Sequence, residues 1–272
     1  MIDRGALNMP EEMIYSTASP RIGVVVGTFA AIPYIHLHLE NWRRHYPQTP
    51  LLINDDGSPY IDELEALCVR YGASLIRNEC RLRQTVGDMS AYVNGFDWAQ
   101  SQGIEILVKL SRRFLPCYDW VAELQALAFR SQMPTFSQTC NHFNFGFRTE
   151  CIGFHCESWR ASGALDAIRG HVTRNEPVFV EGFIHQLARK TATDYSSSAA
   201  KDYMRQNPRP PDRDGYAVWS IMPDRRTTRI PQLLWHDCDG PFDYCRAAAI
   251  YGLSYTAKEF EDANQGCGQG EP

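Results

Sequence analysis

The 272-residue sequence contains no apolar run of 18 residues or more, which excludes a membrane-spanning helix of ordinary length. It also lacks an excess of basic residues, since 27 lysines and arginines stand against 32 aspartates and glutamates. A general nucleic-acid binder needs a broad basic surface to neutralise phosphates, so we expect no nucleic-acid partner. Residues 1–20 mix charges with Gly, Pro and Ser and lack the apolar core of a signal peptide. We expect a flexible N-terminal tail there and a cytoplasmic protein, with peripheral association with a membrane left open.

None of the nine cysteines belongs to a CxxC pair. Most of them fall inside apolar or mixed segments, without a repeating spacing, as cysteines used as small core residues do. We therefore expect reduced thiols rather than a disulfide framework or a cysteine-rich metal site.

Apolar runs that alternate with helical patterns dominate the first 120 residues. Four segments are typical of buried strands: 22–29, 51–54, 73–77 and 104–110. Amphipathic helical patterns separate them; Ser58 and Pro59 suit the cap and first position of the second helix, and the third helix is expected over about 88–102. Strands alternating with helices predict an α/β fold, with a mostly parallel central sheet flanked by helices.

The second half of the sequence is less regular, and we assign residues 121–262 to the same domain. The expected elements are a helix at 118–130, one or two strands at 143–156, a helix at 177–190, a long mobile loop at 193–229, a strand end at 232–237, a helix at 242–252 and a disordered tail at 263–272.

Polar residues follow three of the predicted parallel strands. They are Gly27-Thr28-Phe29, Asp55-Asp56-Gly57-Ser58 and Ser111-Arg112-Arg113. Ligands of open parallel sheets bind beyond the carboxyl ends of the strands, so the three segments should face one crevice. The Asp-Asp-Gly-Ser sequence is also common as a turn and helix cap.

The order strand, helix, strand, Asp-Asp-Gly-Ser resembles the nucleotide-binding half of glycosyltransferases with the GT-A fold, especially the large inverting family called GT2. The segment 87–99 is similar to a pattern of that family, and the resemblance covers about residues 21–120. It implies that this part of the chain binds a nucleotide-sugar. By position, the implied donor-binding residues are Thr28, Phe29, Asp55, Asp56 and Asp88.

The sequence departs from the resembled fold at the end of the fourth strand. Most members have Asp-x-Asp there, which holds a divalent metal on the donor diphosphate, whereas this chain has Ser111, Arg112 and Arg113. Guanidinium groups bind phosphate oxygens through two parallel hydrogen bonds and keep their charge at ordinary pH. We therefore expect these residues to bind the diphosphate without a metal or other cofactor. Two alternatives stay open: the arginines only solvate a loop, or a former metal site has decayed in a protein that binds without catalysis.

An inverting transfer needs a general base that accepts the proton of the acceptor hydroxyl. The resemblance implies a carboxylate at the start of a helix, in a Glu-Asp-like pair. Glu181 occupies such a position, although Gly182 stands where the second carboxylate would be, and a glutamate in a first helical turn is also a partner of the helix dipole. Asp237 and Glu150 are the alternative bases.

Aromatic and histidine residues of the second half suggest where an acceptor binds. Trp159 is a candidate platform for a sugar ring, although core packing explains it as well. His236 and Asp237 lie at a strand end without the HxxxH or CxxC spacing of a metal site, so we assign His236 to the acceptor site.

These observations predict an enzyme of the hexosyltransferase kind. It would move a sugar from a nucleotide-diphosphate donor, UDP-linked in the first instance, to a glycan or lipid-linked acceptor, as in polysaccharide biosynthesis. A non-catalytic relative that binds nucleotide or glycan is the alternative. A nucleotidyltransferase ranks lowest, because that chemistry needs metal-binding carboxylates that Ser111-Arg112-Arg113 does not supply.

Overall fold

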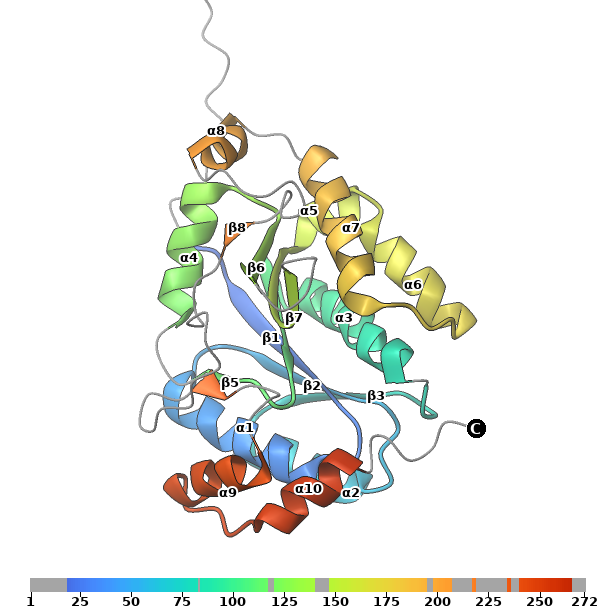
Figure 1. Cartoon of the computed structure of the whole chain (residues 1–272), viewed down its shortest axis with the longest axis vertical. Coiled ribbons are helices and arrows are strands. Elements are labelled where there is room, and N and C mark those ends of the chain that lie inside the picture. The colour runs from blue at the N-terminus through green and yellow to red at the C-terminus, as the bar shows by residue number, and fades with distance from the viewer. Residues whose placement is uncertain are drawn as a thin grey trace, which may run out of the picture.

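The computed structural model describes residues 19–82, 84–116, 120–139, 147–194, 198–206, 217–218, 234–235 and 240–265. Within this part of the chain, the central element is a seven-stranded sheet of order β3-β2-β1-β4-β7-β6-β8 (Figure 1). Its strands are β1 Ile22–Thr28, β2 Leu51–Asp55, β3 Ser74–Arg77, β4 Ile106–Ser111, β6 Thr135–Thr139, β7 Phe147–His155 and β8 Ala217–Val218. A two-stranded sheet pairs β5 Leu115–Pro116 with β9 Leu234–Trp235.

Most neighbours in the large sheet are parallel. β1 pairs in parallel with β2 and β4, β2 with β3, and β6 with β8. β7 is antiparallel to both β4 and β6. The prediction of an α/β fold with a mostly parallel central sheet is confirmed.

Helices cover both faces of this sheet, as Figure 1 shows. They are α1 Ile32–His45, α2 Ile61–Tyr71, α3 Gln84–Ser101, α4 Trp120–Ser131, α5 Cys156–Ala161, α6 Ala164–Arg174, α7 Val180–Asp194, α8 Ser198–Gln206, α9 Pro241–Ile250 and α10 Ala257–Gln265. One apolar cluster joins the sheet to α1, α2 and α4, and a second joins it to α3, α5, α6 and α7.

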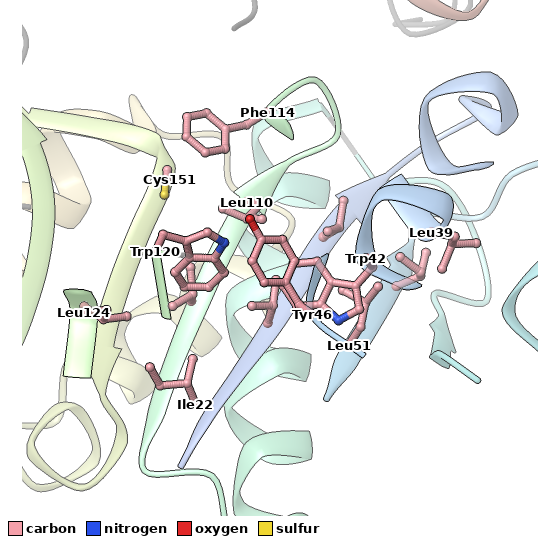
Figure 2. Close-up of a cluster of buried hydrophobic side chains, with 14 of the residues drawn as sticks. Ile22, Leu39, Trp42, Tyr46, Leu51, Leu110, Phe114, Trp120, Leu124 and Cys151 are labelled. Carbon is pink, nitrogen blue, oxygen red and sulfur yellow. The ribbon is translucent and has the colours of Figure 1, made fainter. Parts of the chain in front are cut away.

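The continuous apolar sequence of β1 follows from its position between these two layers. Val24 and Val26 pack into the first cluster, whereas Val25 packs into the second. Figure 2 shows the first cluster, in which Trp42 of α1 and Trp120 of α4 lie with ring centroids 6.2 Å apart. Burial on both faces removes the polar alternation that a half-exposed strand would show.

The C-terminal helices α9 and α10 pack on the outer side of α1. The ring of Tyr34 lies 4.8 Å from that of Tyr244 and 4.9 Å from that of Phe260, in edge-to-face geometry. These contacts hold α9 and α10 against α1, the helix that follows β1. Helix α10 also reaches the segment after β4, because Arg112 Nη2 donates to Asn264 Oδ1 at 3.4 Å.

The structure corrects several predicted element boundaries. Ser58 and Pro59 precede α2, whose N-cap is Tyr60, so Ser58 does not cap that helix. The segment 193–229, predicted as one long loop, includes the end of α7, helix α8 and strand β8. The tail predicted from residue 263 is still helical to Gln265. Strand β6 and helices α5, α6 and α10 were not predicted from the sequence.

The described part of the chain contains no helix that is both long and apolar enough to cross a membrane. Five of its cysteines are described, and all five carry free thiols: Cys68, Cys80, Cys151, Cys156 and Cys245.

Candidate functional site

The loops after β1 and β2 are held together by Asp55 and Ser58. Asp55 is fully buried, and its carboxylate accepts from the Ser58 backbone N–H at 2.8 Å and from the Ser58 hydroxyl. The same hydroxyl oxygen accepts from the backbone N–H of Ala30 at 2.7 Å. Asp55 thus stabilises the turn that follows β2 by accepting two hydrogen bonds from Ser58. Its buried carboxylate holds this turn and does not make the donor contact that was predicted from the sequence.

Asp56 faces the other way, into a pocket at the carboxyl edge of the sheet. Its side chain is nearly buried, and Oδ1 accepts from Asn78 Nδ2 at 2.8 Å and from the Leu82 backbone N–H at 3.2 Å. Oδ2 has no hydrogen-bond partner among the described residues. Burial raises the pKa of this carboxyl, while the bond from Asn78 and the charge of Arg81 oppose the rise. Asp56 therefore presents one bound and one available oxygen.

A network of amides and one hydroxyl lies beneath Asp56. Asn78 Nδ2 also donates to Ser90 Oγ at 2.9 Å, Asn94 Nδ2 donates to Asn54 Oδ1 at 2.7 Å, and Ser90 Oγ donates to the Gly87 carbonyl at 2.8 Å. These bonds connect the ends of β2 and β3 to α3. The orientation of Asp56 is thus fixed by three separate elements.

The pocket above this network joins the residues that follow β1, β2 and β4. Its lining is formed by Gly27, Thr28, Phe29, Asp56, Arg81, Gly87, Asp88 and Arg112. The structure therefore brings together Thr28, Phe29, Asp56, Asp88 and Arg112 of the predicted donor-binding set. Thr28 Oγ1 is buried without a hydrogen-bond partner among the described residues.

Phe29 and Arg81 form one wall of the pocket. The guanidinium carbon of Arg81 lies 3.9 Å from the centroid of the Phe29 ring, which is the geometry of a cation–π contact. Arg81 reaches this place because Gly57 has a φ of 76°, and its backbone lies directly against that of Arg81. The wall offers a flat surface and a positive charge side by side.

The two arginines after β4 occupy different environments. Arg112 lines the pocket, and its Nε is buried without a partner among the described residues. Arg113 is not one of the lining residues, and its carbonyl oxygen accepts from the Tyr244 hydroxyl at 2.7 Å. Ser111 Oγ is buried without a partner in the described part of the chain. Arg112 is thus the arginine of the pair that faces the pocket.

Asp88 carries a second charged contact at the β4 side of the pocket. Its Oδ1 accepts from Lys109 Nζ at 2.6 Å, and the Lys109 side chain is only 3% exposed. Lys109 Nζ also lies 5.2 Å from the centroid of the Tyr92 ring. The side chain of Asp88 is 34% exposed, so this ion pair is buried at its cationic end and open at its anionic end.

Glu181 lies in the first turn of α7, next to β7. Its Oε1 accepts from the hydroxyl of Thr149 at 3.4 Å. Burial raises the pKa of Tyr92 well above its ordinary value, and the charges of Asp88, Glu181 and Glu150 add to the rise. The negative charges of all three carboxylates thus act on one buried tyrosine of α3.

The remaining predicted site residues divide into two groups. Trp159 is fully buried and donates to the Pro134 carbonyl at 3.1 Å and to Thr135 Oγ1 at 2.9 Å, so the structure gives it a core position instead of an acceptor-facing one. His236 and Asp237 lie outside the described residues, although the β5–β9 ladder places the preceding Trp235 opposite Leu115. Within the described ranges, no three histidine, cysteine, aspartate or glutamate residues form a group suited to a metal ion.

Three residues of the site were missed in the sequence: Asn78, Arg81 and Lys109. Asn78 and Arg81 lie in a polar segment without a repeating pattern, and only the tertiary structure brings them to Asp56 and Phe29. Lys109 had a usable signal, because it is a charged residue inside an apolar strand that is buried on both faces.

No model of a known protein family matches the sequence, and no curated protein matches it. Solved structures share part of its chain path. A structure of S. aureus TarS 1-349 in complex with UDP is 9% identical, covering 89% of this chain and 69% of that chain at a TM-score of 0.48. The glycosyltransferase GlyE of Streptococcus pneumoniae TIGR4 is 12% identical over 75% of this chain, at a TM-score of 0.42.

A cytidylyltransferase from Leptospira borgpetersenii is 13% identical, covering 70% of this chain and 95% of that chain at a TM-score of 0.39. This chain spans 46% of the GlyE chain, which is about half of its length.

Proposed function

We propose that this protein is a glycosyltransferase that moves a sugar from a nucleotide-diphosphate donor, with a UDP-sugar as the first candidate, to a hydroxyl of a glycan or lipid-linked acceptor. The observation that carries the proposal is the pocket itself. It joins an anchored carboxylate, an aromatic wall and a guanidinium nitrogen that has no partner among the described residues, at the carboxyl edge of a mostly parallel sheet, where ligands of such sheets bind.

The Asp56 end of the pocket suits a nucleoside. Asp56 Oδ2 can accept a hydrogen bond from an N–H of a pyrimidine base or from a ribose hydroxyl. The adjoining ring of Phe29 and guanidinium of Arg81 provide flat surfaces on which a base can stack. The amide network beneath Asp56 keeps the carboxylate in place before the ligand arrives, which lowers the entropy lost on binding.

The Arg112 end suits a diphosphate. A guanidinium group can bind phosphate oxygens through a pair of hydrogen bonds, and Nε, which has no described partner, is one of the donors in that fork. When the bond between the sugar C1 and the diphosphate oxygen breaks, negative charge develops on the diphosphate. A fixed positive charge stabilises it, as a metal ion would. We therefore propose that Arg112 takes over this role and that transfer does not require a divalent metal.

The acceptor end follows from the position of Glu181. In an inverting transfer the acceptor oxygen attacks C1, the C1–oxygen bond to the diphosphate breaks, and the acceptor proton passes to a base. We propose Glu181 as that base, because it contacts Thr149 of β7, and β7 is the neighbour of β4 on the side away from β2 and Asp56. Glu150 and Asp237 are the alternatives.

A panel of nucleotide-sugars tests the proposal. Each would be scored for binding by calorimetry and for hydrolysis or transfer by release of the nucleoside diphosphate, with and without excess EDTA. We expect at least one UDP-sugar to bind and to turn over in EDTA. Binding without turnover for every donor would favour a non-catalytic nucleotide-binding protein, and the absence of any nucleotide binding would contradict the proposal.

A further inference from the structure

The order of the strands gives the pocket a direction. β2, β1, β4 and β7 are consecutive neighbours in the sheet, at a spacing of about 4.8 Å from strand to strand. Asp56 follows β2, Thr28 ends β1 and Arg112 follows β4. A nucleotide with its base at Asp56 and its diphosphate at Arg112 therefore lies across three strands. Whatever is attached to the diphosphate then lies beside β4, the strand that carries Lys109.

Asp88 and Lys109 meet beside β4, on the face of the sheet that α3 covers, and Asp88 Oδ1 also lies near Gly27 of β1. Lys109 is on β4, and its Nζ donates to Asp88 Oδ1 of α3 across the space between the sheet and that helix. Asp88 and Tyr92 are one turn apart on α3 and so project from the same side of the helix. Because Lys109 Nζ approaches both the carboxylate and the ring, the ammonium group is enclosed by two residues of one helix.

A buried ammonium group is costly unless it is paired, so Lys109 requires the Asp88 carboxylate close to it. The pairing occupies Asp88 Oδ1 alone. Asp88 Oδ2 has no partner among the described residues, and the side chain lines the pocket. The pair thus presents one carboxylate oxygen in a fixed position.

A carboxylate oxygen accepts hydrogen bonds and repels phosphate, so the group suited to this position is a hydroxyl. We propose that Asp88 binds a hydroxyl of the transferred sugar and that Lys109 is the positioning residue that holds Asp88 for this contact. The proposal rests on the proposed function. The sugar would then be recognised at the salt bridge between Lys109 of β4 and Asp88 of α3. The Thr149–Glu181 contact belongs to the neighbouring strand β7 and to α7.

Calorimetry with UDP and with UDP-glucose, UDP-galactose and UDP-N-acetylglucosamine tests this inference. The quantity compared between variants is the ratio of the affinity for a UDP-sugar to the affinity for UDP, because this ratio cancels effects on the nucleoside and diphosphate contacts. Asp88→Asn should lower the ratio about tenfold for the sugar that the wild type binds best, as expected for a lost charge-assisted hydrogen bond.

The double variant Asp88→Asn/Lys109→Met avoids leaving a buried charge unpaired and keeps the net charge of the wild type. It should fold, should bind UDP within about twofold of the wild type, and should show the same tenfold lower ratio. If Lys109 acts through Asp88, Lys109→Met should lower the ratio on its own but not further in the Asp88→Asn background. Lys109→Arg keeps a cation beside Asp88, so its affinity ratio should lie between those of Lys109→Met and the wild type.

Asp97 and Arg169 provide the matched control. They form an exposed ion pair between α3 and α6, with Arg169 Nη2 2.9 Å from Asp97 Oδ1, and neither residue lines the pocket. Asp97→Asn/Arg169→Met should leave both affinities unchanged. An unchanged ratio in the Asp88 variants with intact UDP binding would overturn the sugar contact alone. If the wild type bound neither UDP nor any of the three UDP-sugars, both the choice of a UDP-sugar as donor and this inference would be overturned.

Discussion

Gly87 lies directly against the carboxylate of Asp56, so closely that a Cβ at position 87 would overlap Oδ2. The substitution Gly87→Ala therefore tests the position of Asp56 without removing any polar group. Alanine suits the interior of α3, but its methyl group would push the carboxylate out of place. We expect about tenfold weaker UDP binding, equivalent to about 1.4 kcal/mol, with the helix intact by circular dichroism.

Gly170 serves as the control for this substitution. It is also a helical glycine, in α6, and a Cβ there would meet only the flexible end of Arg174. Gly170→Ala should leave UDP affinity unchanged. Equal affinities of the Gly87→Ala and Gly170→Ala variants would show that UDP does not use the Asp56 oxygen beside α3.

Removal of the Asp56 carboxylate should weaken nucleoside binding itself. Since a hydrogen bond to a charged group is worth about 1.5–3 kcal/mol, Asp56→Ala should lower the affinity for both uridine and UDP by about tenfold or more. The thermal midpoint should fall modestly, because Asn78 and the Leu82 backbone lose their acceptor, but the turn should stay formed because Asp55 holds it to Ser58. A wild-type UDP affinity in this variant, measured by calorimetry, would remove Asp56 from the site.

Glu181→Gln separates catalysis from binding. If Glu181 accepts the acceptor proton, the amide should lower turnover by about 100-fold or more while donor affinity stays intact. Glu157, an exposed glutamate in the first turn of α5, is the control for a helix-dipole role, and Glu157→Gln should keep full turnover. Unchanged turnover in Glu181→Gln would transfer the assignment to Glu150 or Asp237.

Glu40 should make the stability of the protein depend on pH. Burial alone would raise the pKa of this carboxyl, but hydrogen bonds from Arg43, Tyr71 and Arg44 outweigh burial and lower the pKa from 4.5 to about 2. A lowered pKa in the folded state stabilises the protein above the unfolded value. This stabilisation is lost as the pH falls from about 4.5 to 2, where Glu40 takes up a proton.

The comparison of wild type with Glu40→Gln isolates this contribution, because all other carboxyls are common to both proteins. At pH 7 the variant should be less stable by on the order of 2 kcal/mol, a value reduced for solvent screening at the exposed ends of Arg43 and Arg44. The difference should shrink toward zero near pH 2 in urea unfolding. Glu65→Gln, on the exposed side of α2, should show no such difference, and a constant difference for Glu40→Gln at all pH values would contradict the assignment.

The first hundred residues of the fold were predictable because local sequence and tertiary position agree there. β1, β2 and β4 are buried on both faces, so their apolar runs identify them without further information. The polar residues that follow them collect at one edge because parallel strands end on the same side. Thr28, Asp56 and Arg112 were found in this way, and the structure brings all three to one pocket.

The remainder depends on contacts that a sequence pattern does not contain. β6 is short and mixed, and it forms because β7 pairs with it in antiparallel fashion. From the sequence alone, Trp159 cannot be distinguished from an exposed tryptophan that binds a sugar ring. In the structure its ring packs against those of Phe96 and Phe154 in the core. Arg81 reaches the pocket only through the left-handed backbone of Gly57, and Ser58 turns back to Asp55 instead of capping α2.

Calorimetric titration of UDP and uridine into the wild type, Arg112→Ala and Arg113→Ala, all in excess EDTA, tests whether Arg112 binds the diphosphate without a metal. Arg112 lines the pocket, whereas Arg113 does not, and only UDP presents a diphosphate. The wild type should bind UDP in EDTA, and Arg112→Ala should weaken UDP binding by about tenfold or more but leave uridine binding within about twofold. Arg113→Ala should have a smaller effect on UDP, and Arg112→Lys should restore binding in part, because it keeps the charge and loses the fork. Loss of UDP binding in EDTA with recovery on addition of Mn²⁺, or equal losses for UDP and uridine in Arg112→Ala, would contradict a diphosphate site built on Arg112.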